Sequence, residues 1–152
     1  MMKASSKFFC KVQLFLIGFL ALGAIGGGLV LIISPDGKLM GMPLSMLANS
    51  PFKSFLIPGI ILFSILGIAP MLLILALLKK PVSKIAERFN FFSNMHWSWT
   101  YSIYVAFALI LWIQIQMAFL SAVSWLHTFY MFLAIGIIFI SLLPPVRNQY
   151  KK

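Results

Sequence analysis

Acidic side chains are almost absent from this sequence. Its 152 residues include two, Asp36 and Glu87, against twelve lysines and arginines, so the formal net charge is +10. The two acids fall in different polar segments, at opposite ends of the topology predicted below, so they cannot act as a carboxylate pair. Charged residues of both signs make up only 9% of the chain, whereas a soluble domain has about 25%. The composition therefore excludes an ordinary soluble domain.

Cysteine is scarce too, and catalytic motifs are missing. Cys10 is the only cysteine in the sequence, so an internal disulfide and a dithiol redox cycle, as in dithiol quinone reductases, are excluded. No Ser/His/Asp set, metal-ligand spacing or phosphate-binding loop occurs. His96 and His127 fall on opposite sides of the predicted fold and cannot share a metal. We therefore expect no catalytic residue, no metal and no cofactor.

The positive charge does not indicate nucleic-acid binding. The basic residues lie between apolar blocks, where they hold helix ends at a lipid surface. A nucleic-acid-binding protein would instead carry a basic stripe with interleaved aromatic residues on a polar scaffold. We expect no nucleic-acid partner.

Long apolar stretches are what the sequence has in excess. Hydrophobic residues make up 62% of the chain, and the mean hydropathy is +1.04. Residues 97–143 contain no Asp, Glu, Lys or Arg over 47 positions. Because one bilayer crossing takes about 20 apolar residues, this stretch predicts two helices joined by a turn at Ser121–Ser124. The whole pattern predicts an all-α integral membrane protein, one domain over residues 1–152, with transmembrane helices at residues 12–33, 55–78, 98–120 and 125–143.

The distribution of Lys and Arg predicts the orientation. Three precede the first apolar block, four lie in the second loop and three in the C-terminal tail, whereas the first loop has two and the third has none. The positive-inside rule then places both termini in the cytoplasm. A basic start followed by an apolar run also describes a signal peptide, but residues 12–33 exceed the usual 7–15-residue signal core. We expect a retained helix.

Both longer loops are predicted to carry a short helix at the membrane surface. In the first loop, residues 41–49 are predicted to form a short helix whose first residue is Pro43. This helix would either cover a site as a lid or shield the ends of the long helices. In the second loop, Val82, Ile85 and Phe89 recur at helical spacing and predict an amphipathic helix. Its cations would bind anionic headgroups, with partner docking as the alternative. The predicted anchors are Lys79, Lys80, Lys84 and Arg88.

Small residues and prolines mark expected helix contacts. Gly23 and Gly27 form a G-x-x-x-G pair, which lets another helix approach closely, either in a dimer or within the bundle. Gly59 and Gly67 are predicted to form a face that receives the first helix. Pro58 and Pro70 fall in the second helix and predict kinks.

The apolar spans contain no Asp, Glu, Lys or Arg, so a proton-coupled exporter that needs an intramembrane carboxylate is excluded. What remains is a polar cluster on the outer side. Gln114 and Gln116 point about 200° apart around the helix, so both cannot face one pocket. The hypothesis is a ligand site under the first loop; the alternative is that these groups only bond neighbouring helices or sit at the interface. The candidate ligand-binding residues are Trp112, Gln114, Gln116, Trp125, His127, Tyr130 and Asp36.

Several sequence stretches occur together: SPDG at 34–37, GMPL at 41–44, SPFKSFLIPG at 50–59, SWLH at 124–127 with Tyr130, and LLPPVR at 142–147. In this combination the chain resembles a group of small four-helix bacterial inner-membrane proteins with no assigned activity. The resemblance implies a multi-pass protein of the bacterial cytoplasmic membrane. It implies no reaction.

The leading hypothesis is a non-enzymatic membrane protein that binds a lipid-like ligand on its outer side or serves as a subunit of a membrane assembly. Its partners would be membrane lipids and either a second copy of the chain or another membrane protein. The first alternative is a small oligomeric transporter or pore for a hydrophobic or amphiphilic substrate, with the two prolines as hinges. The last is a membrane enzyme acting on a lipid, with His127 as acid or base.

Overall fold

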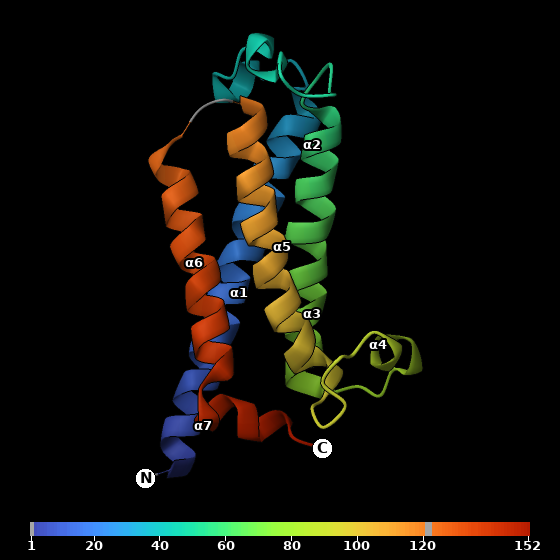
Figure 1. Cartoon of the computed structure of the whole chain (residues 1–152), viewed down its shortest axis with the longest axis vertical. Coiled ribbons are helices and arrows are strands. Elements are labelled where there is room, and N and C mark those ends of the chain that lie inside the picture. The colour runs from blue at the N-terminus through green and yellow to red at the C-terminus, as the bar shows by residue number, and fades with distance from the viewer. Residues whose placement is uncertain (1, 121–122) are drawn as a thin grey trace.

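The computed structural model describes residues 2–120 and 123–152, which form a bundle of long helices (Figure 1). Four helices are long and apolar enough to cross a membrane: Ser6–Ile33, Leu56–Lys79, Trp97–Leu120 and Trp125–Leu142. The described residues contain no strand, apart from one isolated bridge between Met95 and Lys151. The predicted all-α bundle with four helices of membrane-spanning length is confirmed.

The named elements follow one another along the chain. The long ones are α1 (Met2–Ile33), α5 (Trp97–Leu120), α6 (Trp125–Leu142) and a rod made of α2 (Leu56–Ile61), η3 (Leu62–Ile68) and α3 (Ala69–Lys79). The short ones are η1 (Lys38–Met40), η2 (Leu44–Leu47), α4 (Lys84–Arg88), α7 (Pro144–Arg147) and η4 (Asn148–Tyr150).

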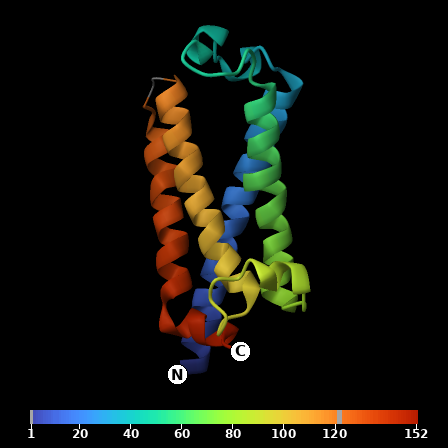
Figure 2. The same ribbon diagram turned by 45° about the vertical axis from the view of Figure 1, so that its right-hand side comes forward.

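The long helices run up and down in chain order, and α1 closes the ring by packing on both the α2–α3 rod and α6 (Figure 2). Both termini, α4 and α7 lie at one end of the bundle, which we call the terminal end (Figure 1). The segments η1 and η2 lie at the other, the η1–η2 end. One large core joins all four long helices and is centred on residues such as Ile17, Leu20, Ala106, Ala134 and Ile137.

The helix ends agree with the sequence prediction within a residue or so, except at the start of α1. That helix begins at Met2, ten residues before the predicted position. Polar residues end an apolar run, but they do not end a helix unless Gly, Pro or a capping residue stops it. Residues 121–122 of the predicted turn lie outside the described residues, and Ser124 is the N-cap of α6.

The first loop differs from the prediction. In place of one short α-helix it forms two 3₁₀ turns, and Pro43 precedes η2 instead of beginning a helix. The second loop has the predicted short helix, α4, with the Ser83 hydroxyl accepting a hydrogen bond from the Ala86 backbone N–H at 3.3 Å.

The two prolines predicted to cause kinks have different surroundings in the rod. Pro58 is the third residue of α2, where a backbone N–H has no acceptor within the helix, so proline is tolerated there. Pro70 follows η3, a seven-residue π-helix in which the Ala69 N–H bonds to Ser64 O. A π-helical segment inserts a wider turn. This one contains Leu66, whose carbonyl lies one turn before Pro70 and would clash with the proline ring in a regular helix. The irregular stretch therefore directly precedes Pro70.

Glycines let α1 and the rod touch backbone to backbone. A Cβ added at Gly28 would lie 2.7 Å from the Phe63 backbone nitrogen, and one at Gly59 would lie 3.1 Å from the Gly28 carbonyl oxygen. Gly67 lies against Ile25, with 3.2 Å from its added Cβ to the Ile25 nitrogen. The face of Gly59 and Gly67 thus receives α1, and its glycine partner on α1 is Gly28.

Candidate ligand-binding site

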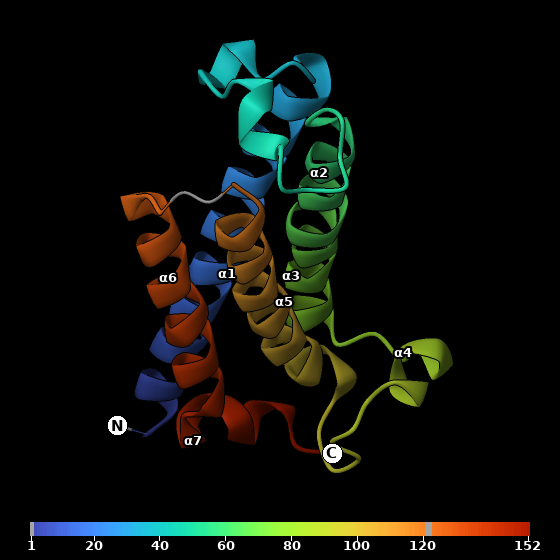
Figure 3. The ribbon, with the colours of Figure 1, turned by 45° about the horizontal axis from the view of Figure 1, so that its top comes forward.

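A hollow of about 440 Å³ lies among α1, α5 and α6 at the η1–η2 end, and we call it the main pocket. Its deep part is apolar, with Leu20, Leu109 and Ile113. The segment that carries η1 and η2 contributes three methionines, Met40, Met42 and Met46. Figure 3 shows this segment above the ends of α1 and α2. Methionine is flexible and polarizable, so this border of the pocket can adapt to ligands of different shape.

The glycines of α1 create the space in this hollow. Gly23 and Gly27 lie one turn apart and both line the main pocket. A Cβ at Gly23 would lie 2.5 Å from the Tyr130 hydroxyl oxygen, whereas one at Gly27 would meet only the Leu62 side chain at 3.5 Å. The G-x-x-x-G pair, predicted as a helix-packing motif, therefore leaves room for Tyr130 and for the pocket instead of receiving a helix backbone.

Polar side chains enter the pocket from two helices. Gln116 comes from α5, while His127 and Tyr130 come from α6, and Ser124 lies just before α6. By rise per residue, Gln116 lies about 10 Å closer to the η1–η2 end than Leu109 does. The main pocket therefore has an apolar deep part and a polar part nearer the η1–η2 end.

The start of α6 fixes the tautomer of His127. The Ser124 backbone N–H donates to His127 Nδ1 at 3.0 Å, and the His127 backbone N–H donates to the Ser124 carbonyl at 3.1 Å. His127 thus takes the place of the Glu or Gln that closes a capping box. An acceptor at Nδ1 means that the neutral ring carries its proton on Nε2, which leaves an N–H donor for a ligand.

The structure brings together some of the predicted site residues and separates others. Trp112, Gln116, His127 and Tyr130 all line the main pocket. Gln114 instead lines a second hollow of about 280 Å³ on the α5–α6 pair, which shares Ile113 and His127 with the main pocket. Gln114 and Gln116 therefore serve different hollows, as their spacing requires.

Trp125 and Asp36 line neither of these two hollows. Trp125 is 73% exposed, so its indole lies on the outside of the bundle. Asp36 closes the turn before η1, where its carboxylate accepts from the Ser34 hydroxyl at 2.5 Å and the Lys38 N–H at 3.2 Å. These two hydrogen bonds, with Lys38 Nζ at 3.1 Å, lower the pKa of Asp36 to about 2. Asp36 is thus an anion that shapes the loop.

The three methionines and Ser124 are pocket residues that the sequence analysis missed. A signal was present, because Met40, Met42 and Met46 cluster in a loop that is otherwise rich in polar residues, glycine and proline. Apolar side chains in a loop need a surface to cover. Which surface they cover depends on where the loop folds back, and sequence spacing does not give that.

The main pocket combines hydrogen-bond donors with an apolar lining. Among the described residues that line it, none carries a carboxylate, an ammonium or a guanidinium group. Trp112, Gln116, His127 and Tyr130 can each donate a hydrogen bond. Donors above an apolar floor suit a neutral molecule with an acceptor oxygen at one end and a hydrocarbon body.

No protein-family model, curated protein sequence or solved structure matches the chain.

Proposed function

We propose that this chain is a multi-pass membrane protein that binds a neutral, lipid-like ligand in the main pocket. The observation that carries the proposal is the pocket itself, about 440 Å³ of mostly apolar lining with convergent polar groups from α5 and α6. Pockets that bind small molecules are usually apolar and carry a few polar groups that set the orientation of the ligand.

The outer surface of the bundle supports a bilayer environment. Large apolar side chains lie exposed on the long helices, among them Phe15 at 68%, Leu72 at 60%, Phe132 at 69% and Phe139 at 63%. A water-soluble monomer rarely exposes large contiguous apolar surface. Hydrocarbon around the helices accounts for this exposure.

The arrangement of charge supports a cytoplasmic terminal end. Both termini and the loop of α4 lie at that end of the bundle (Figures 1 and 2). These three segments carry ten of the twelve Lys and Arg residues, which the positive-inside rule assigns to the cytoplasm. The pocket then opens toward the outer side. The resemblance noted above favours the bacterial cytoplasmic membrane.

The polar lining supports the ligand class. Donors outnumber fixed acceptors in the pocket, because Nδ1 of His127 is already used by the Ser124 N–H. A carbonyl or ester oxygen would accept from these donors, and a hydrocarbon chain would replace water on the apolar floor. Monoacylglycerols and quinone-like molecules have this chemistry.

A photo-crosslinking experiment tests the proposal. The protein is reconstituted in vesicles with a diazirine-bearing monoacylglycerol, irradiated and mapped by mass spectrometry. We expect crosslinks on α5 and α6 at main-pocket positions. Gly23→Leu should abolish them because its side chain fills the space before Tyr130, whereas Gly26→Leu should not, since nothing lies within 4 Å of a Cβ at Gly26.

A second variant tests the pocket even if Gly23→Leu fails to fold. Gln116→Leu keeps the volume of the pocket and removes one donor, which should weaken labelling by up to about tenfold. Equal labelling of the pocket in all three variants, or labelling confined to the outer surface, would overturn the proposal. A stoichiometric protein partner in the same preparation, without pocket labelling, would support the alternative of a subunit in a membrane assembly.

A further inference from the structure

The second loop is held against the side of the bundle at a fixed level. We call residues 79–92 the α4 platform; they include α4 and the chain on both sides of it. Three aromatic side chains of α5 donate hydrogen bonds to its backbone carbonyls. The bonds are Trp97 Nε1 to Pro81 O (2.8 Å), Tyr101 OH to Ala86 O (3.3 Å) and Tyr104 OH to Phe89 O (3.0 Å).

These bonds determine where the platform lies relative to a bilayer. The three donors span eight residues of α5, from Trp97 to Tyr104, and the seven steps between these two residues cover about 10 Å of helix. The platform therefore runs beside the first two turns of α5 and projects sideways from the bundle (Figures 1 and 3). Trp and Tyr collect at the headgroup level of membranes, so the platform shares that level if the helices cross.

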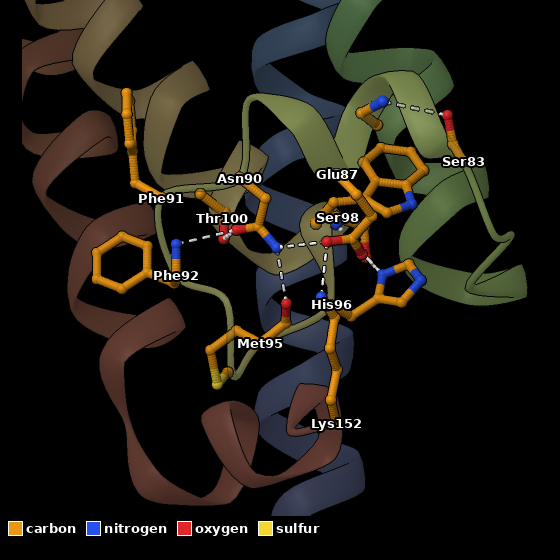
Figure 4. A network of polar contacts seen from close by, with 12 residues as sticks. Ser83, Glu87, Asn90, Phe91, Phe92, Met95, His96, Ser98, Thr100 and Lys152 are labelled. Carbon is orange, nitrogen blue, oxygen red and sulfur yellow. Dashed lines mark hydrogen bonds and ion pairs between the residues drawn. The ribbon is translucent and has the colours of Figure 1, made fainter.

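The C-terminal tail supports the platform from the other side. Lys152 Nζ pairs with the Glu87 carboxylate at 2.6 Å, and the Lys152 backbone N–H donates to Asn94 O at 3.1 Å. The His96 N–H donates to Tyr150 O at 2.7 Å. Figure 4 shows Glu87, Asn90 and Lys152 meeting in one network of polar contacts. The acid of the platform is thus turned toward the protein and neutralised there.

The outward side of the platform carries only apolar and cationic side chains among its most exposed positions. Ile85 and Phe89 are 78% and 59% exposed, next to the exposed Lys84 and Arg88. Two more apolar side chains flank α4, and they are almost fully exposed: Val82 at 94% and Phe91 at 87%. Water is a poor solvent for such a surface.

We propose that the outward side of the α4 platform binds the anionic phospholipid surface beside the bundle. Lys84 and Arg88 contact lipid phosphates, while Val82, Ile85 and Phe91 enter the boundary between headgroups and acyl chains. Charge complementarity favours anionic lipid, because the one acid nearby already pairs with Lys152. Apolar residues beside cations on a surface helix are the pattern of interfacial membrane binding. This site rests on membrane insertion of the bundle and is independent of the main pocket.

A fluorescent reporter on the platform tests this proposal. The substitution Ile85→Cys is made in a Cys10→Ser background, and the new thiol is labelled with an environment-sensitive dye. The full chain is then reconstituted in phosphatidylcholine vesicles with or without phosphatidylglycerol. We expect a blue-shifted emission that deepens with phosphatidylglycerol. Lipids with a nitroxide near the headgroup should quench the dye more than lipids with a nitroxide at the chain end.

A matched pair of charge variants tests the cations. Lys84→Gln with Arg88→Gln removes two cations from the platform, and Lys38→Gln with Lys53→Gln removes two from the η1–η2 end. Phosphatidylglycerol retained by the purified protein should fall about fivefold for each platform cation removed. The control pair should retain as much as the parent protein.

A label at Ile115, which is 45% exposed on α5, separates the two proposals. If that label reports water, the bundle is not embedded and the proposed function fails with the platform site. If Ile115 lies in hydrocarbon while the label at Ile85 stays in water, only the platform site is overturned. The platform site is also overturned if the two double variants retain equally reduced amounts of phosphatidylglycerol. It is overturned too if the dye at position 85 shifts only when another protein is present.

Discussion

Gln13 is a polar side chain near the start of the apolar stretch of α1, and it is fully buried. Its amide nitrogen donates to the hydroxyls of Ser102 at 3.1 Å and Ser141 at 2.8 Å. These contacts tie α1 to α5 and α6 at one point. Its Oε1 has no hydrogen-bond partner among the residues that the structure describes. A buried acceptor without a partner costs about 1–3 kcal/mol, so Gln13 stabilises less than its two bonds suggest.

Gln13→Met should unfold at the same temperature as the parent protein or at a higher one. Methionine keeps nearly the same volume and removes the unpaired oxygen, while the Ser102 hydroxyl keeps its bond to Trp99 O at 2.6 Å. Gln13→Ala leaves a cavity and should lower the unfolding temperature. Thermal unfolding of both variants in detergent, read by circular dichroism, checks this. A clear loss of stability in Gln13→Met would show that the amide bonds dominate.

At the level of elements, glycine position decides whether an added methyl group stabilises or destabilises. Alanine favours a helix over glycine by about 1 kcal/mol. At Gly26 that preference acts alone, since nothing lies within 4 Å of the added Cβ. At Gly28 the same methyl group meets the Phe63 backbone nitrogen at 2.7 Å and the Gly59 carbonyl oxygen at 2.9 Å, which must move apart.

We therefore expect opposite effects from two similar substitutions. Gly28→Ala should destabilise by about 1–3 kcal/mol, the usual range for overpacking, whereas Gly26→Ala should be neutral or slightly stabilising. Unfolding by a denaturing detergent, measured side by side for the two variants, distinguishes them. If Gly28→Ala proved as stable as Gly26→Ala, the close crossing of α1 and α2 would be wrong.

The positions of the helices were predictable because each depends on a long run of residues. Many apolar positions contribute to one span, so a local error changes little. The level of a residue along a helix was predictable for the same reason, which is why Trp112, Gln116, His127 and Tyr130 were expected near one another. Rotation about the helix axis depends on packing partners instead. Trp125 was therefore placed in a site that it does not line.

The shape of the first loop was less predictable than the helices. Its turns depend on single contacts, such as the Phe55 N–H donating to Pro35 O at 2.8 Å. Gly37 has a φ of +76°, a left-handed conformation that suits glycine. Neither this hydrogen bond nor the conformation of Gly37 follows from hydropathy. The position of the methionines beside the main pocket depends on both.

At the scale of the whole molecule, the C-terminal tail joins distant parts of the chain at the terminal end, because it packs against the end of α3. Lys80 Nζ donates to Gln149 O at 2.6 Å and lies 4.8 Å above the ring of Tyr150. The Tyr150 hydroxyl donates to Leu77 O at 3.4 Å, and burial raises its pKa to about 12. Tyr150 thus stays protonated over the physiological range and holds the tail against α3.

The pairing of Glu87 with Lys152 makes the tail contact depend on pH. Burial raises the pKa of Glu87, but hydrogen bonds from Lys152 and Asn90 outweigh this effect and lower it below the usual 4.5. Burial also lowers the pKa of the neighbouring His96, which favours its neutral form. A lowered carboxylate pKa stabilises the folded state above the unfolded-state pKa. That stabilisation is lost as pH falls through the lower, folded-state pKa.

Hydrogen exchange should follow this titration. The His96 N–H, which donates to Tyr150 O, should stay protected at neutral pH and exchange faster once Glu87 is protonated. Glu87→Gln should remove the pH dependence and leave intermediate protection at all pH values, because Asn90 and Lys152 can still bond an amide oxygen. Protection of His96 that does not change with pH in the parent protein would contradict the role of this pair.

The π-helical turn between α2 and α3 also determines the direction in which the side chains of α3 point. Each residue of a regular helix advances the side chains by about 100°, so one residue more or less at 62–68 turns the whole of α3. With the present length, Leu73 and Leu77 point into the core. Deleting one residue there would allow a straighter rod, but it would rotate these leucines toward the outside. The number of residues in this segment is thus constrained even where their identity is not.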